Sequence, residues 1–137
     1  MATSADIGYG TTFSWNAQLI GEVTSISGVN ITVSKQDATL INATDATKEI
    51  KPGLIDPGDV TITGWCDPDD TGQALMWTDL KARTKKAWLI TFPASISSAV
   101  WGGNGYLLGF STDEVTPEGL VPFTAVIGIT ELPTWTP

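Results

Sequence analysis

The stretch that decides the fold begins with Asp59-Val-Thr-Ile-Thr63, continues with Asp67-Pro-Asp-Asp-Thr-Gly-Gln-Ala-Leu75 and ends with Ala87-Trp-Leu-Ile-Thr-Phe92. The first and third segments are rich in β-branched and aromatic residues, which is typical of strands. In the middle segment Asp70 is a suitable N-cap and Gln73 follows three residues later, which is a capping-box arrangement. The stretch therefore predicts a strand, one helix and a second strand.

Apolar positions predict how these elements are buried. Ala74, Trp77 and Leu80 recur at a helical spacing and predict the buried face of the helix. Residues 87–92 are apolar on nearly both faces, so we expect this strand in the middle of a sheet, between two layers. The cations of residues 81–86 suit the C-terminal end of the helix, where positive charge complements the helix dipole.

The N-terminal part of the chain is patterned for strands. Residues 12–20 alternate apolar with uncharged polar side chains and predict one half-buried strand. Its expected apolar face consists of Phe13, Trp15, Ala17 and Leu19. Residues 22–27 and 29–33 predict two short strands, or one strand interrupted by a bulge at Gly28. Residues 34–58 have few apolar positions and predict a long connection, which makes them a candidate for contact with another chain.

The C-terminal part continues the β pattern. The glycine-rich run of residues 100–106 predicts a hairpin turn, and residues 106–115 predict the strand after it. Residues 120–132 alternate and predict the last strand, and residues 133–137 predict a short tail. The side chains of the last strand that we expect in the core are Phe123, Ala125, Ile127 and Ile129.

Length and composition indicate a single domain. The chain of 137 residues suffices for one core, and its 14 Gly and 8 Pro suit many short strands joined by turns. We therefore expect one mainly β domain with one α-helix over residues 1–137. Within it we expect an N-terminal segment at residues 1–11, the long connection at residues 34–58 and the tail at residues 133–137.

Charge and residue types exclude several classes of function. The chain carries 15 acidic and 7 basic residues, which argues against a protein that binds nucleic acid by neutralising phosphates. Because the chain has no histidine, a Ser-His or Cys-His nucleophile is impossible. Cys66 has no second cysteine to pair with, and we expect it to be a small buried residue. The sequence predicts no enzyme, no catalytic residue and no cofactor.

The acidic cluster at the helix start partly matches a calcium loop. Asp67, Asp69, Thr71 and Gly72 occupy suitable positions, but Thr78 stands where a bidentate Glu is needed, so a helix cap explains the cluster better. We therefore expect no metal site. No apolar run approaches the roughly 20 residues that span a bilayer, and the sequence predicts no membrane partner.

Six segments along the chain carry a resemblance to one family of proteins, although none of them is a strict signature. They are Ile20-Gly-Glu-Val-Thr-Ser-Ile-Ser-Gly28, Glu49-Ile-Lys-Pro-Gly-Leu-Ile-Asp-Pro-Gly-Asp-Val-Thr-Ile-Thr63, Asp67-Pro-Asp69 with its helix, Trp88-Leu-Ile-Thr-Phe-Pro93, Gly105-Tyr-Leu-Leu-Gly-Phe110 and Phe123-Thr-Ala-Val-Ile127. Together they resemble the major tail tube proteins of long-tailed bacteriophages and of related phage-like particles such as gene transfer agents. The resemblance covers residues 12–132.

This resemblance implies a β-sandwich or partial barrel flanked by one helix, six copies of which close into a ring. Stacked rings would form a tube with a continuous inner sheet, through which DNA passes into the recipient cell. The implied partners are further copies of the chain and the tape measure, terminator and distal tail proteins. The implied location is the tail of a phage or phage-like particle, after assembly in the host cytoplasm.

Two sets of residues are candidates for this role. Because each neutralised phosphate would retain DNA, the wall of the lumen should carry no fixed cation, and polar strand faces without Lys or Arg fit it. The candidate lumen-facing residues are Ser14, Asn16, Gln18, Thr61, Thr63, Thr124 and Thr130. The long connection carries charges of both signs that can set the register between subunits. The candidate inter-subunit contacts are Lys35, Asp37, Asp45, Lys48, Glu49, Lys51 and Leu54.

Two alternatives remain open at the level of the sequence. One is a monomeric β-sandwich that binds carbohydrate through an exposed Trp15, Trp101 or Trp135. The other is a tube protein from a contractile tail or a secretion apparatus, which would share the fold.

Overall fold

The computed structural model describes residues 8–27, 29–41 and 47–137, and strands dominate this part of the chain. The strands are β1 (Thr12–Trp15), β2 (Gln18–Leu19), β3 (Val23–Ile26), β4 (Thr32–Asp37), β5 (Ile50–Asp56), β6 (Asp59–Trp65), β7 (Lys86–Thr91), β8 (Val100–Thr112), β9 (Pro122–Ile129) and β10 (Thr134–Thr136). The described helices are α1 (Thr71–Ala82) and the short 3₁₀ turn η1 (Ala94–Ile96). The prediction of a mainly β fold with one α-helix is confirmed.

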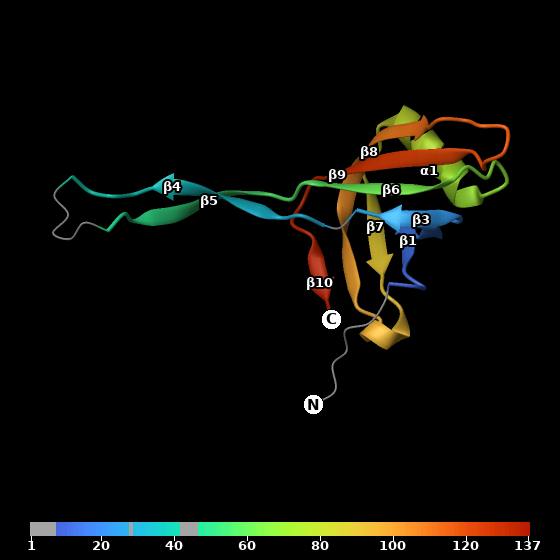
Figure 1. Ribbon diagram of the computed structural model, residues 1–137. Coiled ribbons are helices and arrows are strands. Elements are labelled where there is room, and N and C mark those ends of the chain that lie inside the picture. Colours follow the sequence, from blue (N-terminus) through green and yellow to red (C-terminus); the bar gives the residue numbers. More distant parts are fainter. Residues whose placement is uncertain (1–7, 28, 42–46) are drawn as a thin grey trace.

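An antiparallel sheet forms the body of the molecule, with the strand order β2-β1-β7-β8-β9-β6-β3 (Figure 1). The first half of β8 pairs with β7 and β10, and its second half pairs with β9. Because β8 belongs to both halves of the sheet, the sheet curves around one core. α1 packs against β8, β1 and β2, so the body is a partial barrel flanked by a helix.

β4 and β5 form a two-stranded hairpin that projects from the body (Figure 1). We call its described residues, 32–41 and 47–56, the arm. The segment that we predicted as a long connection therefore consists largely of two paired strands. Of the two predictions for residues 22–33, two separate strands are present, β3 and β4, and Gly28 between them is outside the described residues. Nearly all side chains of β4 and β5 are exposed, so no alternation of buried positions marks these strands in the sequence.

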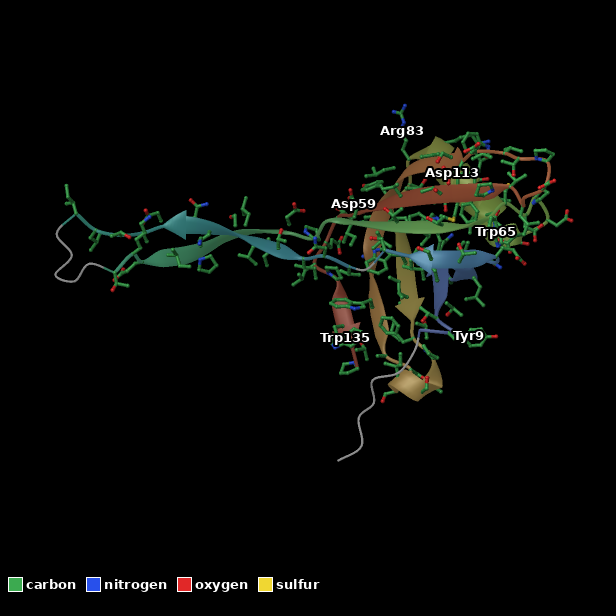
Figure 2. All side chains as sticks on the ribbon, viewed as in Figure 1. Tyr9, Asp59, Trp65, Arg83, Asp113 and Trp135 are labelled. Carbon is green, nitrogen blue, oxygen red and sulfur yellow. The ribbon has the colours of Figure 1, made fainter. Side chains whose placement is uncertain are left out.

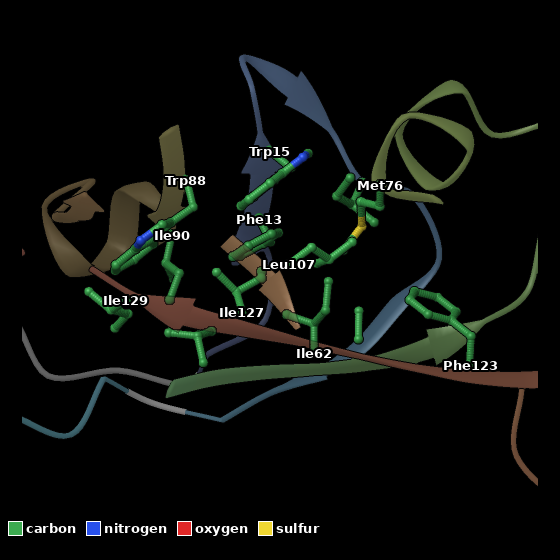
Figure 3. Packing of buried hydrophobic residues seen from close by; sticks show 13 residues of the cluster. Phe13, Trp15, Ile62, Met76, Trp88, Ile90, Leu107, Phe123, Ile127 and Ile129 are labelled. Carbon is green, nitrogen blue, oxygen red and sulfur yellow. The ribbon is translucent and has the colours of Figure 1, made fainter. Parts of the chain in front are cut away.

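The core lies between the curved sheet and α1 (Figure 3). Its buried cluster consists of Phe13, Trp15, Ile20, Val60, Ile62, Met76, Trp88, Ile90, Leu107, Phe123, Ala125, Ile127 and Ile129. The four side chains of β9 that we expected in the core all belong to this cluster. Full burial of a large apolar side chain contributes roughly 1.5–3 kcal/mol, so the cluster is the main source of stability.

The single strand predicted over residues 12–20 is instead a hairpin. Asn16 and Ala17 have positive φ angles of 53° and 65° and form a two-residue turn between β1 and β2. This turn reverses the chain, so Phe13 and Trp15 are buried as predicted but Ala17 and Leu19 are exposed. Asparagine tolerates the left-handed backbone, which is the local signal for this turn.

The hairpin turn predicted over residues 100–106 is absent, because these residues lie inside the continuous strand β8. The glycines make room for large side chains of β7. Gly103 pairs with Trp88, and a Cβ atom at Gly103 would lie 3.3 Å from the indole ring. Gly102 pairs with Leu89, and a Cβ atom there would lie 2.6 Å from the Leu89 side chain. Glycine in a strand here marks close packing rather than a turn.

The helix begins as predicted, because the Asp70 carboxylate accepts a hydrogen bond from the Gln73 backbone N–H at 2.9 Å. The predicted buried face was wrong. Ala74 and Trp77 are exposed and Leu80 is half-buried, whereas the buried residues of α1 are Gly72, Gln73, Met76 and Asp79. Polar residues occupy the buried face because hydrogen bonds within the body satisfy them.

Three smaller predictions are corrected. The predicted tail forms β10, which pairs with the first half of β8. β7 lies in the middle of the sheet as predicted, but one of its faces is open, and Leu89 is 42% exposed. Cys66 is exposed rather than buried, because it follows the last residue of β6, where the chain leaves the sheet. No helix in the described residues is long and apolar enough to cross a membrane.

Candidate functional site

A surface without cations, polar at most of its centre, lies on the outer side of four neighbouring strands, β8, β9, β6 and β3. Because Val60 and Ile62 of β6 point into the core, Thr61 and Thr63 point outward. Thr63 lies directly opposite Thr124 of β9, so these three predicted lumen residues share one surface. We call this surface the threonine face; it consists of Ser25, Thr61, Thr63, Ser111, Thr124 and Val126.

Hydrogen bonds to the sheet hold the polar side chains of the threonine face. The Ser111 hydroxyl donates to the Thr124 carbonyl at 3.4 Å, and the Thr124 hydroxyl donates to the Asp113 carboxylate at 2.6 Å. Asp59 stands at the arm end of β6, and Trp65 stands at its other end (Figure 2). The four strands of this face contain no Lys or Arg. The charged group on them is therefore the carboxylate of Asp59, and the carboxylate of Asp113 lies beside them.

The other predicted lumen residues lie elsewhere. Ser14 pairs with Leu89 on the opposite half of the sheet, and Asn16 and Gln18 belong to the β1–β2 hairpin at its edge. Thr130 follows β9, where its N–H donates to the Asn104 carbonyl at 3.1 Å. The structure therefore brings three of the seven candidates together and leaves the other four outside the threonine face.

The predicted inter-subunit contacts lie on the arm, except Asp45, which is outside the described residues. All six of the others are exposed. The pKa of Asp37 is held below its usual value by hydrogen bonds from the Thr39 backbone N–H and hydroxyl. The arm also exposes Leu54 at 87% and Ile41 fully. An isolated two-stranded hairpin is marginally stable in water.

Sequence reasoning missed a groove beside the edge strand β3. A cavity of about 600 Å³ lies between β3 and the segment before β1, and Tyr9, Ile26, Phe92 and Trp101 are among its lining residues. These residues come from four separate parts of the chain. Only the pairing of the sheet brings them together, so no local pattern could have indicated the groove.

The aromatic residues proposed for carbohydrate binding are mostly packed. Trp15 is fully buried, so it cannot serve as an exposed platform. Trp101 is half-buried and packs against Trp135 with ring centroids 5.0 Å apart, and Phe92 lies 6.0 Å from Trp135. Among the described residues, no group of three or more His, Cys, Asp or Glu is placed to hold a metal ion.

Comparisons with known proteins extend these observations. The sequence matches no protein-family model and no curated protein. A chain from the sheath/tube terminator of the PVC extracellular contractile injection system superposes with a TM-score of 0.75 at 12% identity, with 97% of each chain covered. A chain from the tube terminating cap of the anti-feeding prophage gives a TM-score of 0.76 at 16% identity, covering 99% of this chain and 94% of the other.

A chain from the tail of an empty gene transfer agent particle, determined with C6 symmetry, gives a TM-score of 0.77 at 10% identity. The match covers 97% of this chain and 100% of the other. At these identities the comparisons establish the fold, and they agree with the resemblance found in the sequence. The chain therefore has the fold shared by chains in the tube-terminator and tail structures of phage-like particles.

Proposed function

We propose that this chain is a structural tail tube subunit, six copies of which close into a ring, and that stacked rings form the conduit through which DNA enters a recipient cell. The observation that carries the proposal is the threonine face. It is a mostly polar surface on four adjacent strands, and those strands contain no Lys or Arg. The fold that the chain shares with the tail of a gene transfer agent supports the same role.

Electrostatics explain why such a surface suits a DNA conduit. A Lys or Arg on the wall would neutralise a phosphate and release its counterions, so each cation would add a salt-dependent force that retains DNA. The threonine face offers hydroxyl and methyl groups instead, with Asp59 and Asp113 at its borders. We infer that this face lines the bore, and that DNA slides along it without being held.

Ring closure requires edges that copies of the chain can share. β3 is an edge strand of the body sheet, and among the described residues no strand pairs with the second half of β8 on the side opposite β9. We infer that the β3 edge of one copy joins the second half of β8 in the next copy. This pairing would satisfy both edges and continue the threonine face around the ring. The C6 symmetry of the gene transfer agent tail supports six copies.

The arm supplies a second contact in this proposal. Its exposed apolar side chains, Leu54 above all, would pack against a neighbouring subunit or ring. Its charges, including Lys48, Glu49 and Lys51, would set the register of that contact. The tape measure, terminator and distal tail proteins would be the other partners in the particle, and assembly would take place in the host cytoplasm.

Size exclusion and negative-stain electron microscopy of the purified protein test this proposal. We expect rings or tubes with a central channel at high protein concentration. A protein that stays monomeric at every concentration and salt condition would overturn the proposal. Rings with Lys or Arg lining the channel would overturn the assignment of the threonine face.

A further inference from the structure

The body of the molecule carries a patch of positive charge and, apart from it, a patch of negative charge. Outside the arm, every Lys and Arg of the chain lies within residues 81–86, between the end of α1 and the start of β7. We call this patch the basic pole; it consists of Lys81, Arg83, Lys85 and Lys86. A second patch, which we call the acidic pole, consists of Glu22, Asp67, Asp69, Glu114 and Glu118.

The acidic pole comes from three segments that the sheet brings together. The Cys66 N–H donates to the Val121 carbonyl at 2.6 Å, which places the segment before α1 beside the loop between β8 and β9. The Trp65 N–H donates to the Glu22 carbonyl at 2.9 Å, which adds the start of β3. A surface hollow lined by Glu22, Asp67 and Gly119, among others, confirms that these segments adjoin.

The two poles lie at opposite ends of α1. Residues 67–70 precede the helix and residues 81–86 include and follow its last turn. At about 1.5 Å per residue, the 12 residues of α1 separate the poles by roughly 18 Å. In Figure 2 Arg83 lies at the top of the body, and Trp65, which is next to the acidic pole, lies at its right side.

Within the described residues, the basic pole is only partly neutralised. Lys85 pairs with Glu131 at 3.0 Å, and Lys81 lies over the Trp77 ring, but in the described part of the chain Arg83 and Lys86 contact no carboxylate. None of the described cations contacts the acidic pole either. The helix dipole explains Lys81, which lies in the last turn, but not Glu114, Glu118 or Lys86, which lie outside the helix.

We propose that rings stack by contact between the basic pole of one copy and the acidic pole of a copy in the next ring. Opposite patches at opposite ends of one chain form a heterologous interface, which propagates in one direction instead of closing as a dimer. This inference rests on the proposed tube function, because it assigns to the poles the stacking step that follows ring closure. Complementary charge also speeds encounter and fixes register.

Charge reversal at the two poles tests the inference. We compare the wild type with Arg83→Glu/Lys86→Glu and with Glu114→Lys/Glu118→Lys, and Arg83→Lys/Lys86→Arg is the charge-preserving control. Negative-stain microscopy and sedimentation report rings and tubes, and circular dichroism confirms that each variant is folded. We expect the wild type and the control to form tubes and each reversal variant to stop at rings. An equal mixture of the two reversal variants should recover stacks, because it restores opposite charges at each contact.

Salt dependence gives a second measurement. Because the Debye length falls from about 10 Å at 0.1 M to about 3 Å at 1 M salt, wild-type tubes should separate into rings as the salt rises. Tubes of normal length from Arg83→Glu/Lys86→Glu would overturn the inference. The loss of rings in this variant would also overturn it, because the basic pole would then contribute to contacts between subunits of one ring and not to stacking. A wild type that forms neither rings nor tubes would instead overturn the proposed function itself.

Discussion

The Trp15 indole N–H donates a hydrogen bond of 2.7 Å to the Asp79 carboxylate, and both side chains are buried. This bond joins β1 to α1 across 64 residues of sequence. A second buried polar residue of α1, Gln73, donates to the carbonyls of Gly21 and Trp65 at 3.2 and 3.0 Å. These bonds fix the helix on the barrel and explain why its buried face carries polar residues.

Loss of the Asp79 acceptor should destabilise the monomer. Asp79→Ala leaves the buried Trp15 N–H without a partner, so we expect the free energy of unfolding to fall by about 1–3 kcal/mol. Asp79→Asn keeps an acceptor oxygen and should lose less. Urea unfolding of both variants measures the difference, and the exposed Asp69→Ala is the control. Equal stabilities of Asp79→Ala and the control would show that the bond contributes nothing.

The glycines of β8 offer a matched pair. A Cβ atom at Gly105 would lie 2.6 Å from the Gly128 carbonyl oxygen of β9, whereas at Gly109 nothing lies within 4 Å. Gly105→Ala forces two backbones apart, and we expect a loss of about 1–3 kcal/mol in the free energy of unfolding. Gly109→Ala should leave the stability unchanged or slightly higher, since alanine restricts the unfolded chain. Thermal unfolding that ranks the two variants in the reverse order would contradict the packing described for β8.

The sequence predicted the elements that have one buried and one open face. β6 and β9 show the expected alternation because every second side chain is buried in the core and those between them are half-buried or exposed. The role of Gly103 was not visible, because the reason for it is Trp88 on the neighbouring strand. Burial of Asp79 was not visible either, because its partner lies far away in the sequence.

The candidate site was predictable to a similar extent. Thr61, Thr63 and Thr124 were correctly predicted to share one face, because strict alternation along β6 and β9 fixes the face of each side chain. Ser14 and Gln18 do not lie on that face, and they belong to different strands because the turn at Asn16 reverses the chain between them. The arm was predicted as a contact segment from its length, and this stays a prediction. Its pairing was not predicted, because its strands pair through the backbone and leave no hydrophobic pattern.

The contact between Lys85 and Glu131 should depend on pH. Hydrogen bonds from Lys85 and Asn104 lower the pKa of Glu131 below its usual 4.5, and the bond to Glu131 raises the pKa of Lys85 above 10.5. The stabilising contribution is therefore present between these values. It is lost as the pH falls through the lowered pKa of Glu131, and it is also lost as the pH rises through the raised pKa of Lys85.

Unfolding of the wild type and Glu131→Gln at neutral pH and in acid checks this dependence. The wild type should be slightly more stable at neutral pH, and the difference should vanish in acid, where Glu131 is protonated in both states. Because the pair is exposed, its effect is small and should weaken with added salt. A difference that persists unchanged in acid would mean that the variant acts through packing rather than charge.

A cation on the threonine face should make the tube retain DNA. Thr63→Lys places an ammonium group on the outward side of β6, in the row that includes Thr124 and Ser25. We expect tubes of this variant, assembled with short duplex DNA, to sediment with DNA at low salt and release it at high salt. Wild-type tubes should retain little. The control Ser95→Lys adds the same charge on η1, away from this face. If both variants retained DNA equally, the threonine face would not line the bore.

The arm should matter for assembly and not for the stability of the monomer. Leu54 is 87% exposed, so Leu54→Ser should change the free energy of unfolding of the monomer by less than about 0.5 kcal/mol. If a neighbouring subunit covers Leu54, the same change removes buried apolar area from every contact in the ring, and rings or tubes should be fewer and shorter. Leu19→Ser, at a site on β2 that is 59% exposed, is the matched control. Reversal of the arm charges by Lys48→Glu/Lys51→Glu should shorten tubes in the same way. Microscopy of all three variants at equal concentration decides the point, because normal tubes from both arm variants would leave the arm without a role in assembly.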